Sequence, residues 1–252
     1  MNAIRSEWTK LRSVRSTWIA ALSAVVAGVA LSVLGASDLL GTPAADLPAG
    51  WDPTAASLKG FLFAQLIIGM LGAFSVTPEF GTGMIGTSLV FVPSRPRLLA
   101  AKAVVVAGLG LAVGLVTTVL SFTVVQLMLG GAGLSAAALS DPGVAGALAG
   151  GVLYLALVAL IGLAVGALVR STTSTLAVLV GALLLVPALG PSLPGVLGDL
   201  FGRLWPITAG QSSFAVVPVD GTVSPATGLV ILALATAVVG VAGHMVFRLR
   251  DV

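Results

Sequence analysis

The chain has 252 residues, of which 58% are hydrophobic and only 8% are charged, and its mean hydropathy is +1.14. An ordinary soluble domain carries about 25% charged residues, so this composition predicts an integral membrane protein. The absence of cysteine excludes a disulfide framework, a thiol nucleophile and a cysteine metal site, and a single histidine excludes a histidine cluster.

Apolar runs long enough to cross a hydrocarbon core of roughly 30 Å predict an all-α membrane protein with six transmembrane helices. The runs lie at 17–35, 61–75, 98–129, 144–169, 176–189 and 228–247. The third run is over-long, which indicates a tilted span or one that begins in the interface. The fifth run is short and is bounded by Pro187 and Gly190. Together the runs predict a single transmembrane domain over 1–252.

Residues 1–15 predict an amphipathic helix that lies in the membrane interface. Ile4, Trp8 and Leu11 share one helical face, and basic residues project from the other faces. A cleaved signal peptide is the alternative, but the apolar run at 17–35 is longer than the roughly 7 to 15 residues of a signal sequence. The expected interfacial anchors are Trp8, Lys10, Arg12, Arg15 and Trp18.

The acidic loop after the first span holds Asp38, Asp46 and Asp52. Their spacing does not match a calcium-binding EF-hand loop, so we interpret them as solvated loop acids. No metal site is expected.

The segment 77–97 is the longest interruption of apolar sequence that carries a cluster of positive charge. Thr77, Pro78 and Glu79 predict a helix start, because Thr can cap free N–H groups, Pro suits the first turn and a carboxylate complements the helix dipole. Glycines within 81–86 keep this helix short or loose. We therefore expect a helix and a turn between the second and third spans.

Lys and Arg are distributed unevenly along the loops. If the N-terminus is inside, ten of these residues fall inside and only Lys59 and Arg203 fall outside, which predicts that both termini are cytoplasmic. The pI near 10 then reflects contact with the membrane surface rather than with nucleic acid. The inside group consists of Arg5, Lys10, Arg12, Arg15, Arg95, Arg97, Lys102, Arg170, Arg248 and Arg250.

The segment 190–226 contains five prolines, yet an apolar stripe over 197–205 predicts a non-spanning helix on the outer leaflet. This external segment is a candidate lid. No charge is expected within the spans, which weighs against a proton-coupled pump and favours an apolar substrate, although two glutamines and the hydroxyls at 117–123 could line a path for a neutral polar solute. The candidate pathway and lid residues are Gln65, Gln126, Leu200, Phe201 and Trp205.

Two classes of catalytic motif are absent from the sequence. Lys10, Lys59 and Lys102 do not stand in a phosphate-binding P-loop, so the chain is not expected to hydrolyse ATP by that route. The serines at 88 and 212 lack the flanking glycine of an intramembrane serine protease. His244 is expected to pack between helices or face headgroups rather than to relay protons. We expect no enzyme activity.

Three segments, in the right order, resemble those of ABC-2 type transporter permeases. The first is SEWTKLRSVRSTW at 6–18, which is similar to the amphipathic elbow helix before the first span. The second is the loop that contains Glu79, Gly81-Thr82, Pro93-Ser94-Arg95 and a Leu-Leu-Ala-Ala-Lys run ending at Lys102. The third is RLWPITAGQSSF at 203–214, in which Trp205 stands where Leu is usual. In the second segment, Gly83 and Gly86 replace a basic residue that many members carry.

The resemblance implies the membrane-spanning permease subunit of an ATP-binding-cassette transporter. In that family the cytoplasmic loop at 77–97 carries a coupling helix that docks on an ATPase subunit. The implied partners are two copies of this ATPase, a second permease copy in a homodimer or heterodimer, and the bilayer of the plasma (cell inner) membrane. ATP and Mg are implied on the ATPase, with no cofactor on this chain. The implied docking residues are Glu79, Phe80, Gly81, Thr82, Met84, Arg95 and Arg97.

The predicted function is export of an apolar or amphipathic substrate, driven by the separate ATPase. Two alternatives remain: a secondary carrier that works without an ATPase, and a non-transporting scaffold that assembles other membrane proteins.

Overall fold

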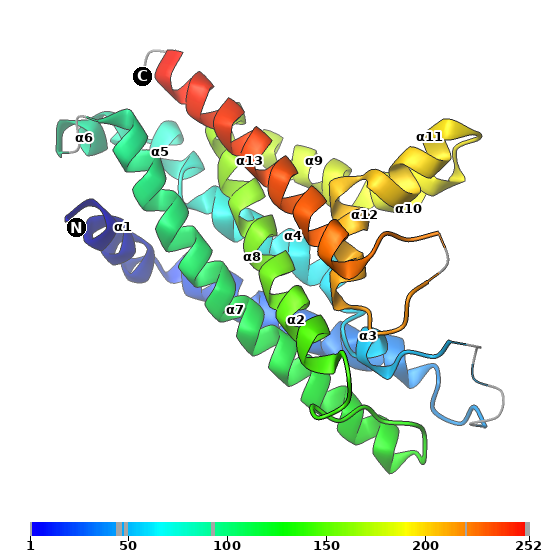
Figure 1. Ribbon diagram of the computed structural model, residues 1–252. Helices are drawn as coiled ribbons and strands as arrows, with labels where there is room; N and C mark the ends of the chain where they lie inside the picture. The colour runs from blue at the N-terminus through cyan, green and yellow to red at the C-terminus, as the bar shows by residue number, and fades with distance from the viewer. Residues whose placement is uncertain (1, 44–46, 48–49, 92–93, 220, 250–252) are drawn as a thin grey trace.

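The computed structural model describes residues 2–43, 47, 50–91, 94–219 and 221–249, which form helices and no strand. This confirms the expected all-α fold, and Figure 1 shows the long helices packed into one bundle. The α-helices are α1 (Asn2–Ser13), α2 (Arg15–Ser37), α3 (Pro53–Ser57), α4 (Phe61–Phe74), α5 (Thr77–Gly81), α6 (Met84–Phe91), α7 (Arg95–Gly131), α8 (Val144–Val169), α9 (Thr172–Val180), α10 (Val186–Leu189), α11 (Val196–Asp199), α12 (Pro206–Gln211) and α13 (Pro225–Leu249). Further turns are π-helical at Gly181–Leu185 and Leu200–Leu204 and 3₁₀-helical at Gly190–Ser192 and Ser212–Phe214.

Within the described residues, five helical segments are long and apolar enough to cross a membrane. They are α2, α7, α8, the stretch Thr172–Ser192 and α13. Helix α4 has only 14 residues, or about 21 Å, which is less than a hydrocarbon core of about 30 Å. The expectation that the fifth run is short was wrong, because its helix continues from Thr172 to Ser192 through a π-helical turn.

Short turns extend α4 at both of its ends. Before α4, the N–H of Phe61 donates to the carbonyl of Leu58 at 3.0 Å, and after it the N–H of Val76 donates to Ala73 at 3.0 Å. These bonds satisfy backbone groups that a bilayer would leave unpaired. Helices α3, α4 and α5 therefore form one interrupted helical path.

Helices α4 and α8 form the centre of the bundle, where their backbones approach closely. A Cβ added at Gly162 in α8 would collide with the carbonyl oxygen of Gly69 in α4, and one added at Gly72 would collide with the carbonyl of Ala159. Small residues permit such contacts between membrane helices. Gly162 and Gly72 therefore allow α4 and α8 to pack with their backbones in contact.

The two ends of the bundle are formed by different elements (Figure 1). We call one end the terminal face: it consists of α1, α5, α6, the first turns of α7, the turn at Arg170 and the last turns of α13. The opposite end, the distal face, includes α3 and the loop 132–143. Arg15 is the first residue of α2, and Arg250 lies outside the described residues; the other basic residues predicted to be inside belong to the elements of the terminal face.

One acid of the first long loop has a structural role that the sequence did not reveal. Asp52 caps α3 through its Oδ1, which accepts from the N–H groups of Thr54 and Ala55 at 2.9 and 3.0 Å. Its Oδ2 accepts from Val216 and Val217 at 2.6 and 2.9 Å. The interpretation as a solvated acid was therefore wrong for Asp52. Asp38 is exposed, and Asp46 lies outside the described residues.

Candidate functional site at the terminal face

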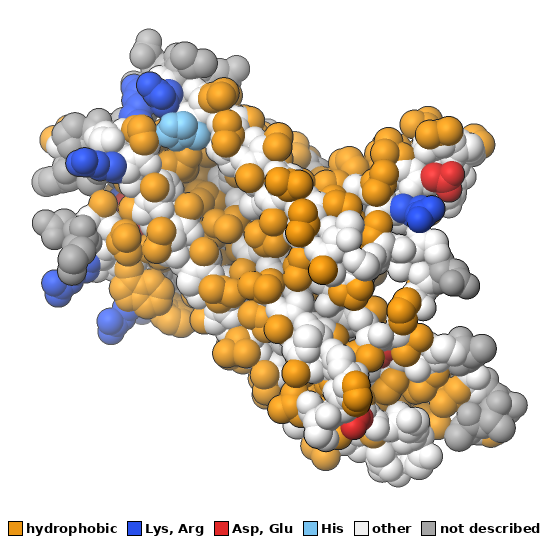
Figure 2. All heavy atoms as spheres, in the orientation of Figure 1, with side chains coloured by type: hydrophobic (Ala, Val, Ile, Leu, Met, Phe, Trp, Pro, Cys, Tyr) orange, Lys and Arg blue, Asp and Glu red, His pale blue; other side chains and the backbone are white. Residues whose placement is uncertain are grey.

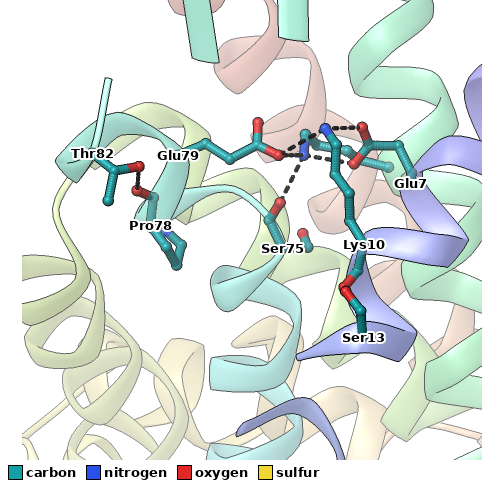
Figure 3. A network of polar contacts seen from close by, with 8 residues as sticks. Glu7, Lys10, Ser13, Ser75, Pro78, Glu79 and Thr82 are labelled. Atoms are coloured by element: carbon teal, nitrogen blue, oxygen red, sulfur yellow. Dashed lines mark hydrogen bonds and ion pairs between the residues drawn. The ribbon is translucent and has the colours of Figure 1, made fainter. Parts of the chain in front are cut away.

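Four charged side chains meet where α1, α5 and α7 come together (Figure 3). The ammonium of Lys102 donates to Glu7 at 2.7 Å, to Glu79 at 2.8 Å and to the carbonyl of Ser75 at 2.8 Å. The ammonium of Lys10 lies 2.6 Å from Glu7 and 3.1 Å from Glu79. We call these four side chains, Glu7, Lys10, Glu79 and Lys102, the ion network.

Local helix geometry explains how the ion network is assembled. Glu7 and Lys10 stand three residues apart on α1, so they share a face. Glu79 lies in the first turn of α5, where its charge complements the helix dipole. Ser75 follows the end of α4, and its carbonyl provides a third acceptor for Lys102. The network thus joins three parts of the chain that are distant in sequence: α1, the junction of α4 with α5, and α7.

Burial makes the charge balance of this network important. Lys102 is 2% exposed and Glu7 is 3% exposed. Burying an ion costs several kcal/mol unless opposite charges and hydrogen bonds compensate. Two ammonium groups face two carboxylates here, so the formal charges cancel. Burial alone lowers the pKa of Lys10, but its hydrogen bonds and charge interactions with Glu7 and Glu79 outweigh this and raise the pKa above the usual 10.5.

Sequence reasoning missed half of the ion network. Glu7 was not singled out, and Lys102 was counted only as one of the inside basic residues. The expectation of no charge within the spans was also wrong, because Lys102 lies in α7 within the predicted third span. One feature of the sequence could have revealed the network: a lysine such as Lys102 inside an apolar run needs an acidic partner. Glu7 of α1 and Glu79 of α5 were the acids available on neighbouring helices.

A second cluster holds the other side of α5. The guanidinium of Arg170 lies 4.9 Å from the centre of the Phe80 ring, and Phe80 packs edge-on against Phe247 with ring centres 6.1 Å apart. Arg170 also donates to the carbonyl of Val246 at 3.3 Å. Its backbone has a φ of 58°, a left-handed conformation that is rare for residues other than glycine. This residue therefore turns the chain between α8 and α9 and fixes α5 and α13 beside it.

The structure corrects the expected orientation of α5. Glu79 and Phe80 both point into contacts within this chain, so neither presents its side chain outward as a docking group would. Thr77 does not cap the helix: the N-cap residue is Val76, and the Thr77 hydroxyl instead accepts a hydrogen bond from Thr172 at 2.9 Å. Because α5 has only five residues, its packing against neighbouring segments decides which residue becomes the N-cap.

Other implied docking residues are accessible. Gly81 and Thr82 are exposed, and Met84 is 52% exposed at the start of α6. Arg97 is also exposed. Arg95 is different, because its guanidinium donates to the carbonyls of Phe247 and Arg248 at 3.1 and 3.0 Å and so closes the end of α13.

Helix α1 packs against α7, as an interfacial helix would. Leu11 is buried, and half-exposed Ile4 and Trp8 border a shallow apolar hollow with α7 residues such as Val104. Among the expected anchors, Arg12, Arg15 and Trp18 are exposed, and the Trp18 indole N–H donates to the carbonyl of Arg12 at 3.0 Å. Lys10 turns toward the ion network instead of outward.

The two glutamines expected to line a pathway are buried within this chain. Gln65 is fully buried, and its amide donates to the carbonyls of Leu62 and Leu183, each at 3.0 Å. Its side-chain oxygen accepts from the Tyr154 hydroxyl. Leu183 lies in the π-helical turn of the Thr172–Ser192 helix, so Gln65 satisfies a backbone group that the irregular turn leaves free. Within this chain it holds α4 against the Thr172–Ser192 helix, and a pathway role for Gln65 stays a prediction.

Gln126 has a similar structural role near the distal face. Its amide donates to the carbonyl of Pro53 at 2.9 Å and to the Ser57 hydroxyl at 2.7 Å. Its oxygen accepts from the N–H of Ala137 at 2.7 Å. These bonds tie α7 to α3 and to the following loop, so the proposed pathway role of Gln126 has no support from its position.

The predicted helix of the outer segment is present, and it folds back on the Thr172–Ser192 helix. Phe201 and Trp205 pack edge-on with ring centres 5.6 Å apart, and the Trp205 indole donates to the carbonyl of Ala182 at 2.9 Å. Leu200 is 44% exposed. A lid role for these three residues stays a prediction.

Comparison with protein families gives a match over most of the chain. The model of a family described as ABC-2 family transporter protein matches residues 3–187. No curated protein matches the chain. The matched range includes α1 except its first residue, the ion network and Arg170.

Proposed function

Because the chain belongs to the ABC-2 transporter family, we propose that it is the permease subunit of an ATP-binding-cassette transporter and that α5 and α6 dock its ATPase. The single observation that carries the docking site is the position of α5. Glu79 connects it to α1 and α7, whereas Phe80 connects it to Arg170 and to α13. A force applied to this short helix therefore acts on the whole bundle.

The exposed part of this region supports contact with a protein partner. In α6, Met84 is 52% exposed and Val90 is 77% exposed, whereas Ile85 on the other side is buried against Leu98. Beside α5 lies a cavity of about 460 Å³, and its wall includes Leu11, Met84 and three members of the ion network, namely Glu7, Lys10 and Glu79. Exposed apolar groups next to a cavity are typical of binding surfaces. We call Met84, Thr87 and Val90 the α6 surface.

We propose that the chain crosses the membrane six times, with α4 and its flanking turns as the second crossing. Chain direction supports this layout, because α2, α7 and the Thr172–Ser192 helix start at the terminal face and α8 and α13 end there (Figure 1). Lys and Arg concentrate at the terminal face, which supports a cytoplasmic orientation for that face.

The transported molecule is proposed to be apolar or amphipathic and to be exported between two permease copies. The support is that Lys102 is neutralised by the ion network at one end of the bundle and that Gln65 and Gln126 are occupied by this chain's own groups. A second permease copy and two ATPase copies complete the proposed assembly. ATP and Mg are proposed to bind those ATPase subunits.

Co-purification with the ATPase tests this proposal. Met84→Asp and Val90→Asp place charges on the α6 surface without touching the core, so we expect loss of ATPase recovery with an unchanged Tm. Val219→Asp is the matched control, since Val219 is 64% exposed in the loop before α13. Full recovery of the ATPase with both α6 variants would refute docking at this surface.

The same experiment separates the alternative functions. A secondary carrier or a scaffold would show no ATPase in the wild-type preparation. A transporter should instead show ATPase stimulation in liposomes that hold both subunits and a lipid-like compound. Stimulation by sugars or small ions alone would contradict the apolar substrate and leave the permease assignment intact.

A further inference from the structure

The membrane-facing surface of α7, α8 and α13 contains a groove that the proposed transport function does not use. Its volume is about 630 Å³, within the usual range for ligand sites. Helix α8 contributes its floor, with Leu157, Leu160 and Ala164, while α7 and α13 contribute the walls. Figure 2 shows this face covered by apolar side chains, with basic side chains gathered toward the terminal face.

Close packing of α13 against α8, and the contact between α7 and the end of α13, shape the groove. Helix α13 lies directly on α8, because a Cβ at Gly243 would come within 2.9 Å of the Ala164 carbonyl oxygen. Arg95 joins α7 to the end of α13, and Leu98 and Phe247 pack together beneath it. The groove is therefore closed at its terminal-face end.

The polar groups around the groove lie at that closed end. His244 lines it, and its ring makes no hydrogen bond to any residue in the described part of the chain. Arg248 follows one helical turn later on α13, and Arg97 stands on the first turn of α7 beside the lining residue Pro96. Both arginines are exposed, and no acidic residue lines the groove. Thr236 is already satisfied by the carbonyl of Leu232.

We propose that this groove binds an anionic phospholipid from the leaflet at the terminal face. An acyl chain occupies the apolar groove between α7 and α13, and the phosphate contacts Arg97, His244 and Arg248. Charge complementarity favours an anionic headgroup, because Arg97 and Arg248 are exposed beside the end of the groove that Pro96 and His244 line. The inference rests on membrane embedding and stands independently of the ATPase and of the transported substrate.

Gly240 provides a direct test because it lines the groove and a Cβ there would meet nothing within 4 Å. Gly240→Phe should fill the groove without disturbing the core. Gly146→Phe is the matched control, since Gly146 in α8 is equally open and lies away from the groove. Ala103→Phe fills the groove from the α7 wall and serves as a second blocking variant.

The measurement is lipid retention by native mass spectrometry on delipidated full-length protein in a non-ionic detergent. The probes are phosphatidylglycerol, phosphatidylcholine with the same acyl chains, and glycerol phosphate without chains. We expect wild type and Gly146→Phe to retain phosphatidylglycerol alone, and both blocking variants to lose it. Replacing Arg97, His244 and Arg248 by Gln should weaken phosphatidylglycerol binding by about 30-fold. The same replacement of Arg12 and Arg15 should have little effect.

Three outcomes would overturn the proposal. Equal retention of phosphatidylcholine would remove the charge argument, and binding of glycerol phosphate alone would identify a phosphate site without a lipid. Unchanged lipid retention by both blocking variants would place the lipid elsewhere. If these variants instead convert a dimer into a monomer without a change in bound lipid, the groove is an interface between two copies of this chain.

Discussion

Lys102 of α7 and Glu79 of α5 form a buried ion pair, with Nζ and Oε1 2.8 Å apart, although 23 residues separate them along the chain. Glu7 of α1 completes the pair from a third helix at 2.7 Å. The segment expected to meet an ATPase is thus attached from within to the interfacial helix and to the longest helix of the bundle.

Removing Lys102 should destabilise the protein strongly. Lys102→Met leaves Glu7 and Glu79 facing each other with only Lys10 for compensation, and breaking a buried pair costs about 3–5 kcal/mol. Unfolding in detergent should report this loss. Adding Glu7→Gln restores the charge balance and should recover part of it. Lys59→Met is the control, because Lys59 is exposed, and a drop of equal size there would contradict a special role for the network.

The contribution of Lys10 should depend on pH. Its folded pKa is raised above 10.5, so the protein gains stability from the charged form below that pH and loses it as the pH rises through the folded value. The Tm difference between wild type and Lys10→Met should therefore be constant near neutral pH and shrink above 10.5. If the Tm difference between the two proteins instead grew as the pH rose above 10.5, the charged form of Lys10 would not be the one that stabilises the fold.

Gln65→Leu should loosen the contact between α4 and the Thr172–Ser192 helix. The change leaves the Leu183 carbonyl and the Tyr154 hydroxyl without their partner, and each unsatisfied buried group costs about 1–3 kcal/mol. We expect a lower Tm and faster hydrogen exchange in the π-helical turn Gly181–Leu185. Phe63→Leu, at a half-exposed position on the same helix, should leave both unchanged. Equal exchange rates in the two variants would show that Gln65 does not hold the turn.

Arg170 offers a test of backbone strain. Both Arg170→Ala and Arg170→Gly lose the contacts to Phe80 and Val246, but only glycine accepts a φ of 58° without steric cost. The glycine variant should therefore be more stable than the alanine variant by about 1 kcal/mol. Both should be less stable than wild type in thermal unfolding. Equal stability of the two variants would mean that the left-handed turn relaxes.

Single-cysteine labelling tests the orientation, since the natural chain has no cysteine. Cysteines at Ser6 and Thr87, both exposed at the terminal face, should resist an impermeant thiol reagent in intact cells and react after lysis. Cysteines at Asp38 and Ser140, exposed toward the distal face, should react without lysis. Labelling of Ser6→Cys before lysis would reverse the proposed topology.

The sequence by itself determined the features that follow from composition and local period. Low charge and long apolar runs predicted the all-α membrane fold, and the apolar stripe around Leu200 predicted a short helix before α13. The ends of α8 were also predicted, because the apolar run at 144–169 coincides with the helix Val144–Val169. These properties depend on neighbouring residues and on the thickness of a bilayer.

Only the tertiary structure decided which polar groups meet. The bond from Lys102 to Glu7 joins residues 95 positions apart, and the bond from Gln65 to Leu183 joins residues 118 positions apart. Hydropathy and helical period say which face of a helix is apolar, but they do not say which helix lies beside it. In a bilayer every buried charge and amide must find its partner on such a neighbour. The inward orientation of Glu79 was therefore set by the packing of α1 and α7 around α5.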